Sequence, residues 1–308
     1  MKKILYFCFI CVSMVIVSCE VMNEEPSKPS GDSNNPNIPV NPDKPSTPDK
    51  EGEEEQPVYP KDPCLTDNVV FVEKPFSISE TAQVIFSPGN LQYHPLSQEW
   101  RFAPSQFCFI GADNANISLL YQGWIDLFGN GTGFNPTNNS MDYQNDYNNL
   151  IDWGINKIGD YAPETWRTLS NEELRYLLEE RTDASNLYCT AKINGVTGLV
   201  LLPDNWETPS GLNFKSGVYK PAEDTSIQTF TTDEWIKLAE SGAVFMPCAG
   251  NRAGVDVKWV GVYGMYWCLY NDGYDGTSKE FLHIETEDVS IGLSPRNIGA
   301  SVRLVRDL

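Results

Sequence analysis

The sequence predicts an α+β domain over residues 64–308, and three observations lead to this prediction. Two segments carry residues that start a helix, several short apolar segments have the composition of strands, and residues 109–160 show little periodicity. Composition changes where this domain begins, because all eight tryptophans and both histidines follow residue 63. The length suits one domain or two small ones, and we expect one because no second proline-rich break interrupts it.

Both expected helices begin at a capping box, in which a hydroxyl and a glutamate three residues later satisfy free backbone N–H groups. The boxes are residues 170–173 and 231–234, and Gly242 is the expected stop of the second helix. The apolar faces that follow are Leu174, Leu177 and Leu178 in the first helix and Trp235, Leu238 and Ala239 in the second. We expect these faces to dock both helices on a sheet.

Short strands are expected throughout the domain, wherever β-branched and aromatic residues cluster between turn residues. They are residues 83–86, 198–202, 243–246, 265–270, 281–286 and 300–305. The region 109–160 is rich in Gly, Asn, Asp and aromatic residues, and so long a loop is uncommon in a compact domain. Its aromatic residues favour ordered loops packed by their own side chains. These residues are Tyr121, Trp124, Phe128, Phe134, Tyr143, Tyr147 and Trp153.

Residues 1–18 have the order of charge, apolar run and small residues of a secretory signal peptide. Lys2 and Lys3 precede an apolar run of fourteen residues, which is shorter than the ~20 residues of a membrane-spanning helix. The run ends just before Cys19 and resembles the lipobox of bacterial lipoproteins, which implies lipidation of Cys19. An ordinary cleaved signal with an incidental cysteine is the alternative.

Residues 19–63 are expected to be a disordered tether. Ten of the 21 prolines lie there among Ser, Asn, Asp and Glu, so the segment has too little apolar surface to fold. The acidic residues Glu20, Glu24 and Glu25 resemble the export signals of surface lipoproteins in Bacteroides-like bacteria, and a plain solvated linker is the alternative. The expected location is the outer membrane, lipid-anchored and facing the outside. The net charge of −20 argues against a nucleic-acid partner, whose phosphates need clustered Lys and Arg.

Cysteine counting leaves alternatives open. Once the signal and the anchor are set aside, the domain retains Cys64, Cys108, Cys189, Cys248 and Cys268. An odd number in an oxidising compartment permits at most two disulfides and leaves at least one free thiol. Cys108 lies between phenylalanines and is interpreted as a small buried hydrophobe. No two of these cysteines have the CxxC spacing of a zinc site.

Eight short blocks are specific as a group, although each alone is weak. They are residues 85–93 (IFSPGNLQY), 100–103 (WRFA), 123–129 (GWIDLFG), 166–169 (WRTL), 195–204 (GVTGLVLLPD), 242–247 (GAVFMP), 266–267 (YW) and 301–305 (SVRLV). In this order they resemble the Fibrobacter-type major paralogous domain of Bacteroides-type surface lipoproteins. More distantly, they resemble the formylglycine-generating-enzyme-like branch of the C-type lectin fold.

The resemblance implies a C-type-lectin-like domain with two helices, a small twisted antiparallel sheet, long ordered loops and chain ends that lie close together. Enzymatic relatives use a copper-binding cysteine pair or an iron-binding histidine cluster. His94 and His283 are the only histidines, so a three-histidine site from this chain alone is excluded. Cys248 and Cys268 are open to three interpretations: two buried thiols, a disulfide, or a copper site.

The resemblance also places ligand-facing side chains between Trp267 and Arg303. Aromatic rings beside amide and carboxylate groups suit recognition of sugars or peptides, because rings give contact area at low entropic cost. The candidate ligand-binding residues are Trp259, Tyr270, Asn271, Asp272, Tyr274, Asp275, His283 and Arg296. Residues 271–276 have the composition of a calcium loop but not its spacing, so a turn is the preferred interpretation.

The expected function is a non-enzymatic binding or adhesion module for a glycan or protein ligand, tethered to the membrane by its lipid. No cofactor, metal or catalytic residue is expected. The alternatives are a copper-dependent oxidase of the formylglycine-generating type that uses Cys248 and Cys268, and a structural subunit of a surface appendage.

Overall fold

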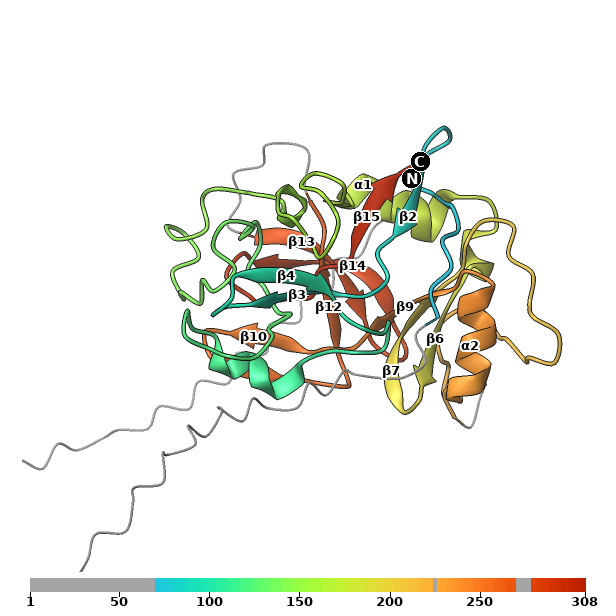
Figure 1. Cartoon of the computed structure of the whole chain (residues 1–308). Coiled ribbons are helices and arrows are strands. Elements are labelled where there is room, and N and C mark those ends of the chain that lie inside the picture. Colours follow the sequence, from blue (N-terminus) through green and yellow to red (C-terminus); the bar gives the residue numbers. More distant parts are fainter. Residues whose placement is uncertain (1–69, 224–225, 270–277) are drawn as a thin grey trace, which may run out of the picture. The chain divides into compact units, whose positions relative to one another are not determined.

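A computed structural model describes residues 70–223, 226–269 and 278–308 of the chain (Figure 1). These residues form an α+β unit with few helices and several small sheets. The expected signal peptide, Cys19 and tether lie outside the described residues. So do Cys64 and the candidate ligand-binding residues from Tyr270 to Asp275.

One four-stranded sheet joins the start of the described unit to its end, with the order β1-β2-β15-β5. Its strands are β1 (Phe76–Ser77), β2 (Gln83–Phe86), β5 (Arg167–Thr168) and β15 (Leu304–Asp307). Phe86 lies opposite Val305 in the antiparallel β2–β15 pair, and Leu304 lies opposite Thr168 in the β15–β5 pair. The first and last parts of the domain are therefore held in one hydrogen-bonded layer (Figure 1).

The second four-stranded sheet has the order β8-β6-β7-β9. Its strands are β6 (Tyr188–Ile193), β7 (Val196–Leu201), β8 (Thr229–Phe230) and β9 (Val244–Pro247). β6 and β7 form a hairpin through Asn194 and Gly195, which both have positive φ, as the preferred two-residue hairpin turn requires. The β6–β8 pair is the one parallel pairing among the described strands of these sheets.

A three-stranded sheet and two hairpins complete the described strands. The sheet contains β12 (Gly264–Trp267), β13 (Ser278–Ile284) and β14 (Val289–Pro295), and the hairpins are β3–β4 (Leu91–His94, Glu99–Phe102) and β10–β11 (Asn251–Ala253, Asp256–Lys258). The expected single antiparallel sheet is therefore replaced by five small sheets in the described part of the chain. Nine of the described strands were not expected from the sequence: β1, β3, β4, β5, β6, β8, β10, β11 and β14.

Both predicted capping boxes are confirmed. α1 (Asn171–Arg175) begins at Ser170, whose hydroxyl accepts the Glu173 N–H, and it continues as a π-helical turn, η3 (Tyr176–Glu180). α2 (Thr232–Glu240) begins at Thr231 in the same way, and Gly242 follows it at a φ of 93°. Three short 3-10 turns, η1 (Gly111–Asn116), η2 (Trp153–Ile155) and η4 (Ala184–Asn186), are the remaining described helical segments.

The β8-β6-β7-β9 sheet separates two apolar clusters, because successive side chains of a strand point to opposite faces. On one face, Val200 and Phe245 share a cluster with the apolar side of α2, and Trp235 lies 5.7 Å from the Phe245 ring. On the other face, Leu199 and Met246 share a cluster with Leu177 of η3. Both predicted helices therefore dock on sheet residues, as expected.

The region 109–160 is ordered largely by its own aromatic residues, as expected, but not by all of them. Phe128, Tyr147 and Trp153 are buried, and Phe128 packs against Trp153 and Trp100. Phe134 and Tyr143, however, are exposed, so the expectation that they plug the loops is wrong. Composition alone does not distinguish a ring that turns inward from one that turns outward.

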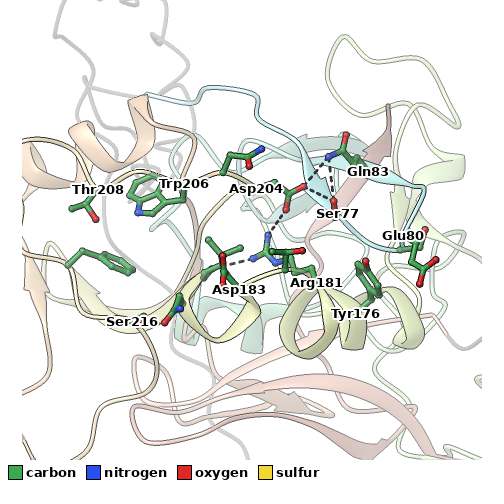
Figure 2. A pocket seen from close by; sticks show the side chains of 16 residues that line it. Ser77, Glu80, Gln83, Tyr176, Arg181, Asp183, Asp204, Trp206, Thr208 and Ser216 are labelled. Atoms are coloured by element: carbon green, nitrogen blue, oxygen red, sulfur yellow. Dashed lines mark hydrogen bonds and ion pairs between the residues drawn. The ribbon is translucent and has the colours of Figure 1, made fainter.

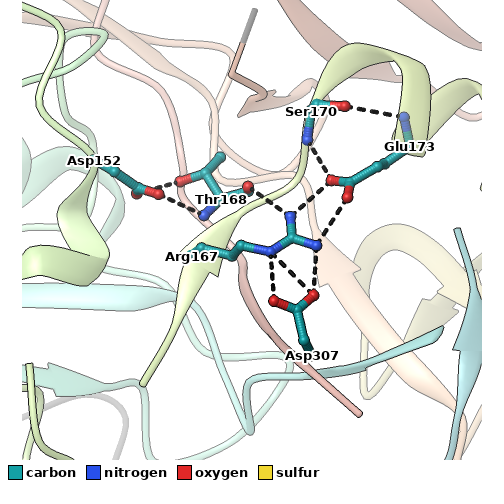
Figure 3. A network of polar contacts seen from close by, with 6 residues as sticks. All are labelled: Asp152, Arg167, Thr168, Ser170, Glu173 and Asp307. Carbon is teal, nitrogen blue, oxygen red and sulfur yellow. Dashed lines mark hydrogen bonds and ion pairs between the residues drawn. The ribbon is translucent and has the colours of Figure 1, made fainter. Parts of the chain in front are cut away.

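Arg167 ties β5 to α1 and to the end of β15 (Figure 3). Its Nη1 and Nη2 lie 2.7 and 2.8 Å from the Glu173 carboxylate, and its Nη2 lies 2.6 Å from Asp307 Oδ1. Asp152 accepts hydrogen bonds from both the backbone N–H and the hydroxyl of Thr168. These contacts are charge-assisted and join segments that are far apart in the sequence, so they lock β5 in place.

The cysteines correct one sequence-based interpretation. Cys108 is disulfide-bonded, so its interpretation as a simple buried hydrophobe is wrong, although it is buried. The other described cysteines, Cys189, Cys248 and Cys268, are free thiols. A disulfide between Cys248 and Cys268 is likewise absent. An apolar local sequence indicates that a cysteine is buried, but it does not show whether that cysteine forms a disulfide.

The buried carboxyl of Asp126 should make the stability of the domain depend on pH, and the Asp126→Asn variant isolates this effect. Its carboxyl is fully buried and accepts hydrogen bonds from the Asn114 amide (2.8 Å) and the Ile110 N–H (2.9 Å). Burial nevertheless raises its pKa from 3.8 to about 6. Between these values the folded state holds a proton that the unfolded state has released, so this group lowers the stability as pH rises.

We therefore compare the unfolding free energy of the wild-type chain with that of the Asp126→Asn variant. As the pH falls from about 6 towards the ordinary pKa of aspartate, the wild-type value should rise by up to about 3 kcal/mol relative to the variant. Urea unfolding of both chains across this range measures the gain. The remaining carboxyls titrate in both chains and cancel in the difference. A difference in unfolding free energy that stays constant over this range would contradict the prediction.

Candidate ligand-binding surface

Trp259 is presented on a rigid turn between β11 and β12. Its side chain is 58% exposed, and its backbone has a φ of 56°. Its carbonyl accepts the N–H groups of Val262 (3.1 Å) and Tyr263 (3.0 Å), and the Gly261 N–H donates to the Cys248 carbonyl (2.8 Å). A bulky residue with positive φ is a conformational outlier, so the fold holds the backbone of Trp259 in a strained conformation.

The Trp259 indole packs on Tyr263, which begins a series of contacting aromatic rings. The Trp259 and Tyr263 ring centroids lie 5.9 Å apart, and those of Tyr263 and His283 lie 4.9 Å apart. His283 is in turn stacked on Phe281, at 6.4 Å and an interplanar angle of 15°. Trp259, Val260, Val262, Tyr263 and His283 are called the Trp259 ledge below. β13 supplies His283, and the 259–263 turn supplies the rest.

The exposed residues of the Trp259 ledge are apolar, and two carboxylates lie next to its His283 side chain. Val260 and Val262, which belong to the same turn as Trp259, are also exposed. The carboxylates of Glu285 and Asp288 lie 3.6 and 3.9 Å from the two ring nitrogens of His283. Burial, with Glu285 as a second cause, raises the pKa of Tyr263 to about 12, so its hydroxyl stays protonated as a hydrogen-bond donor.

The candidate residues named from the sequence separate into three groups. Trp259 and His283 are brought together on the ledge, whereas residues 270–275 lie outside the described residues. Arg296 is buried, and its Nη2 donates to the Tyr143 carbonyl (3.1 Å) and to Asn148 Oδ1 (3.0 Å). Arg296 therefore holds the 143–148 loop and does not share the exposed surface of Trp259.

Several residues of the ledge were missed in the sequence. The exposed valines carried no motif. The signal that could have pointed to them is the clustering of apolar residues around Gly261, a residue with positive φ, directly after the β10–β11 hairpin. Trp267, by contrast, is buried and donates a hydrogen bond to the Phe128 carbonyl (2.7 Å).

Cys248 and Cys268, the cysteine pair that the sequence left open, are free thiols in this fold. Cys248 and Cys268 are both buried, and burial raises the pKa of each thiol to about 12. A thiolate, not a thiol, is the nucleophile and metal ligand, so neither is poised for that chemistry at neutral pH. Of the interpretations left open by the sequence, two buried thiols are what the structure shows.

In the described part of the chain, no three His, Cys, Asp or Glu side chains gather in the manner of a metal site. His94 is satisfied by the protein, with Nδ1 accepting the Ser97 N–H and Nε2 lying 2.8 Å from the Gln122 carbonyl. The described helices are too short and too polar to span a bilayer. Comparisons with protein-family models, with curated proteins and with solved structures give no match.

Proposed function

We propose that this chain is a non-enzymatic binding module in which the Trp259 ledge contacts a glycan or protein ligand. A lipid on Cys19 anchors it to the outer membrane, and residues 19–63 hold the domain away from the bilayer. The observation that carries the binding role is the exposed indole of Trp259 at a positive φ. The membrane role rests on the N-terminal sequence alone.

Energetics support a ligand-contacting role for Trp259. A non-glycine residue in the left-handed region costs about 1–2 kcal/mol, and an exposed indole gains little from burial. A turn residue selected for stability alone would therefore be glycine or asparagine. Strain of this kind is characteristic of binding sites, where it holds a contact group ready before the ligand arrives.

The neighbours of the indole favour a protein ligand over a glycan. Tryptophan is enriched at the centres of protein interfaces, and exposed valines extend the apolar contact there. A glycan is the second candidate, because Glu285 and Asp288 place hydrogen-bond acceptors near the supporting rings. The copper-oxidase alternative lacks this kind of support, since burial keeps both of its thiols protonated.

The C-type-lectin-like fold is part of this proposal. Its support is the pairing of β2 with β15, which brings the two ends of the domain together, and the presence of two capped helices. The long ordered region 109–160 is also in keeping with it.

The ligand-binding role is tested with a combined array of glycans and extracellular proteins, probed with the full chain. Trp259→Ala is expected to weaken the strongest specific signal about thirtyfold or more, because a central tryptophan anchor contributes about 2 kcal/mol or more. The matched control is Leu308→Ala, which removes another exposed apolar side chain at the far end of β15 (Figure 1).

Circular dichroism of both variants shows whether the domain remains folded. A strong array signal that survives Trp259→Ala at full strength would place the binding site elsewhere. A chain that gives no specific signal, but turns over a substrate, would remove the binding-module proposal altogether.

A further inference from the structure

A polar cavity of about 720 Å³ lies between three segments that are distant in the sequence (Figure 2). They are residues 77–83 around β1 and β2, residues 176–187 from η3 to η4, and residues 204–216 after β7. None of these residues belongs to the Trp259 ledge. The volume is in the range of small-molecule binding sites, about 300–1,000 Å³. We call it the Arg181 cavity.

The centre of the Arg181 cavity is a fixed carboxylate. Asp204 Oδ2 accepts a hydrogen bond from the Ser77 hydroxyl at 2.7 Å and another from the Gln83 amide at 3.0 Å. Asp204 Oδ1 accepts from Arg181 Nη1 at 3.2 Å. Three donors from two segments therefore hold this acceptor, which belongs to the third segment, in one orientation. This is the preorganisation that a binding site needs.

Arg181 positions Asp204 and leaves no net positive charge in the cavity. Its guanidinium is buried over the Phe76 ring, and it also donates to the Leu187 carbonyl at 3.3 Å. Its charge is matched by Asp204, whereas Glu80 and Asp183, which also line the cavity, are acidic. The field in the cavity is therefore neutral to negative, which disfavours phosphates, sulfates and carboxylates.

Aromatic rings stand on two sides of this polar centre (Figure 2). Trp206 packs against Phe214 with ring centroids 6.2 Å apart, and Tyr176 lines the opposite side. Trp206 Nε1 is buried and has no acceptor among the described residues.

The remaining lining is made mostly of hydroxyl and amide groups. The hydroxyls belong to Ser77, Ser79, Thr182, Thr208 and Ser216. Asn186 and Asn205 add amides that both donate and accept. A purely apolar ligand would strip water from these groups without replacing their hydrogen bonds, which disfavours it. Rings on two sides and two-way hydrogen-bonding groups between them match a molecule with an apolar C–H face and a hydroxylated edge.

We propose that the Arg181 cavity binds a neutral saccharide, with a C–H face of the sugar on the Trp206 ring and its hydroxyls on Asp204, Gln83 and Asn205. This site is separate from the Trp259 ledge, so it stands or falls independently of the proposed function. Arg181 is a positioning residue in this site, because its guanidinium acts through Asp204.

Saturation-transfer NMR tests this proposal with the full chain and a panel of methyl glycosides of glucose, mannose, galactose and N-acetylglucosamine. Glucose 6-phosphate is the anionic comparison. We expect transfer to at least one methyl glycoside, strongest at its ring C–H protons, and at least tenfold weaker transfer to the phosphate. Trp206→Ala should reduce the transfer at least tenfold.

Two further variants keep the test decisive. Asn205→Gly removes an amide at a residue with a φ of 55°, where glycine is fully compatible, so the domain should fold while sugar binding weakens. Leu308→Ala, which removes an exposed side chain outside both sites, should leave the transfer unchanged. The proposal is overturned if no glycoside of the panel shows transfer, if Trp206→Ala and Asn205→Gly both leave it intact, or if the phosphate binds better. Loss of transfer in Trp259→Ala alone would move the sugar to the ledge.

Discussion

Gly154→Ala is expected to destabilise the domain by more than about 4 kcal/mol, a large part of the roughly 5–15 kcal/mol that stabilises an ordinary domain. Gly154 lies in η2, and its backbone is packed against the start of β5. A Cβ at this position would overlap with the Trp166 carbonyl oxygen, and it would lie 2.7 Å from the Trp166 carbonyl carbon. Backbone atoms of a paired strand have no room to move away, so the clash is not relieved by a change of rotamer.

The effect should extend to the Arg167 network, because the same backbone positions Asp152 against Thr168. Soluble yield and urea unfolding measure the loss. Gly159→Ala is the matched control, since Gly159 has a φ of 55° but no atom within 4 Å of the added Cβ. It should cost only the backbone strain of about 1–2 kcal/mol. Equal effects of the two substitutions would show that Gly154 is not tightly packed.

Asp204→Asn is expected to cost about 3 kcal/mol of unfolding free energy. The side chain of Arg181 is 2% exposed and that of Asp204 is 16% exposed, so removal of the negative charge leaves a buried cation without its partner. Burial already lowers the pKa of Arg181, and Asp204 opposes that shift. Breaking a buried pair by removing one partner typically costs 3–5 kcal/mol, and the partial exposure of Asp204 favours the lower end.

The control for this prediction is an exposed pair in the same domain. Lys220 and Glu223 lie 3.3 Å apart with side chains 59% and 67% exposed, so Glu223→Gln should change the stability by less than about 1 kcal/mol. A double variant, Arg181→Gln with Asp204→Asn, should lose at least about 1 kcal/mol less than the sum of the two single variants. Additive losses would mean that the two side chains do not interact.

Local signals in the sequence predicted local structure well. The two capping boxes identified the starts of α1 and α2, because both partners of each box lie within four residues. The strand expected at 83–86 coincides with β2. The β6–β7 hairpin was readable from Asn194-Gly195, but the strand before this turn was not recognised. Its residues Tyr188 to Ile193 mix polar and apolar side chains without clear alternation.

Structure that depends on distant partners was not predictable in the same way. β14 contains Gly292 and serines and is only half-buried, so its assignment as a strand comes from pairing with β13. The partition of the strands into five sheets depends on pairings such as β2 with β15, which join opposite ends of the domain. No periodicity within one segment encodes such a pairing.

The same distinction between local signals and distant contacts applies to the candidate binding sites. Trp259 was recognised because an aromatic residue among turn residues is itself a local signal, and the structure shows it exposed. The Arg181 cavity went unnoticed, because its residues come from three segments that meet only in the fold. Arg296 was a candidate because it lies in the segment that the resemblance made ligand-facing, but the structure shows it buried, with its acceptors on the 143–148 loop.

Fluorine NMR of the chain labelled with fluorotryptophan tests the central claim most directly. The chain has eight tryptophans, and the resonance of Trp259 is assigned from its loss in Trp259→Phe. During titration with the strongest ligand from the array, the account predicts that the Trp259 resonance shifts with ligand concentration while those of the buried Trp153 and Trp267 stay in place. A Trp259 resonance that stays fixed while the ligand saturates the chain would contradict the account.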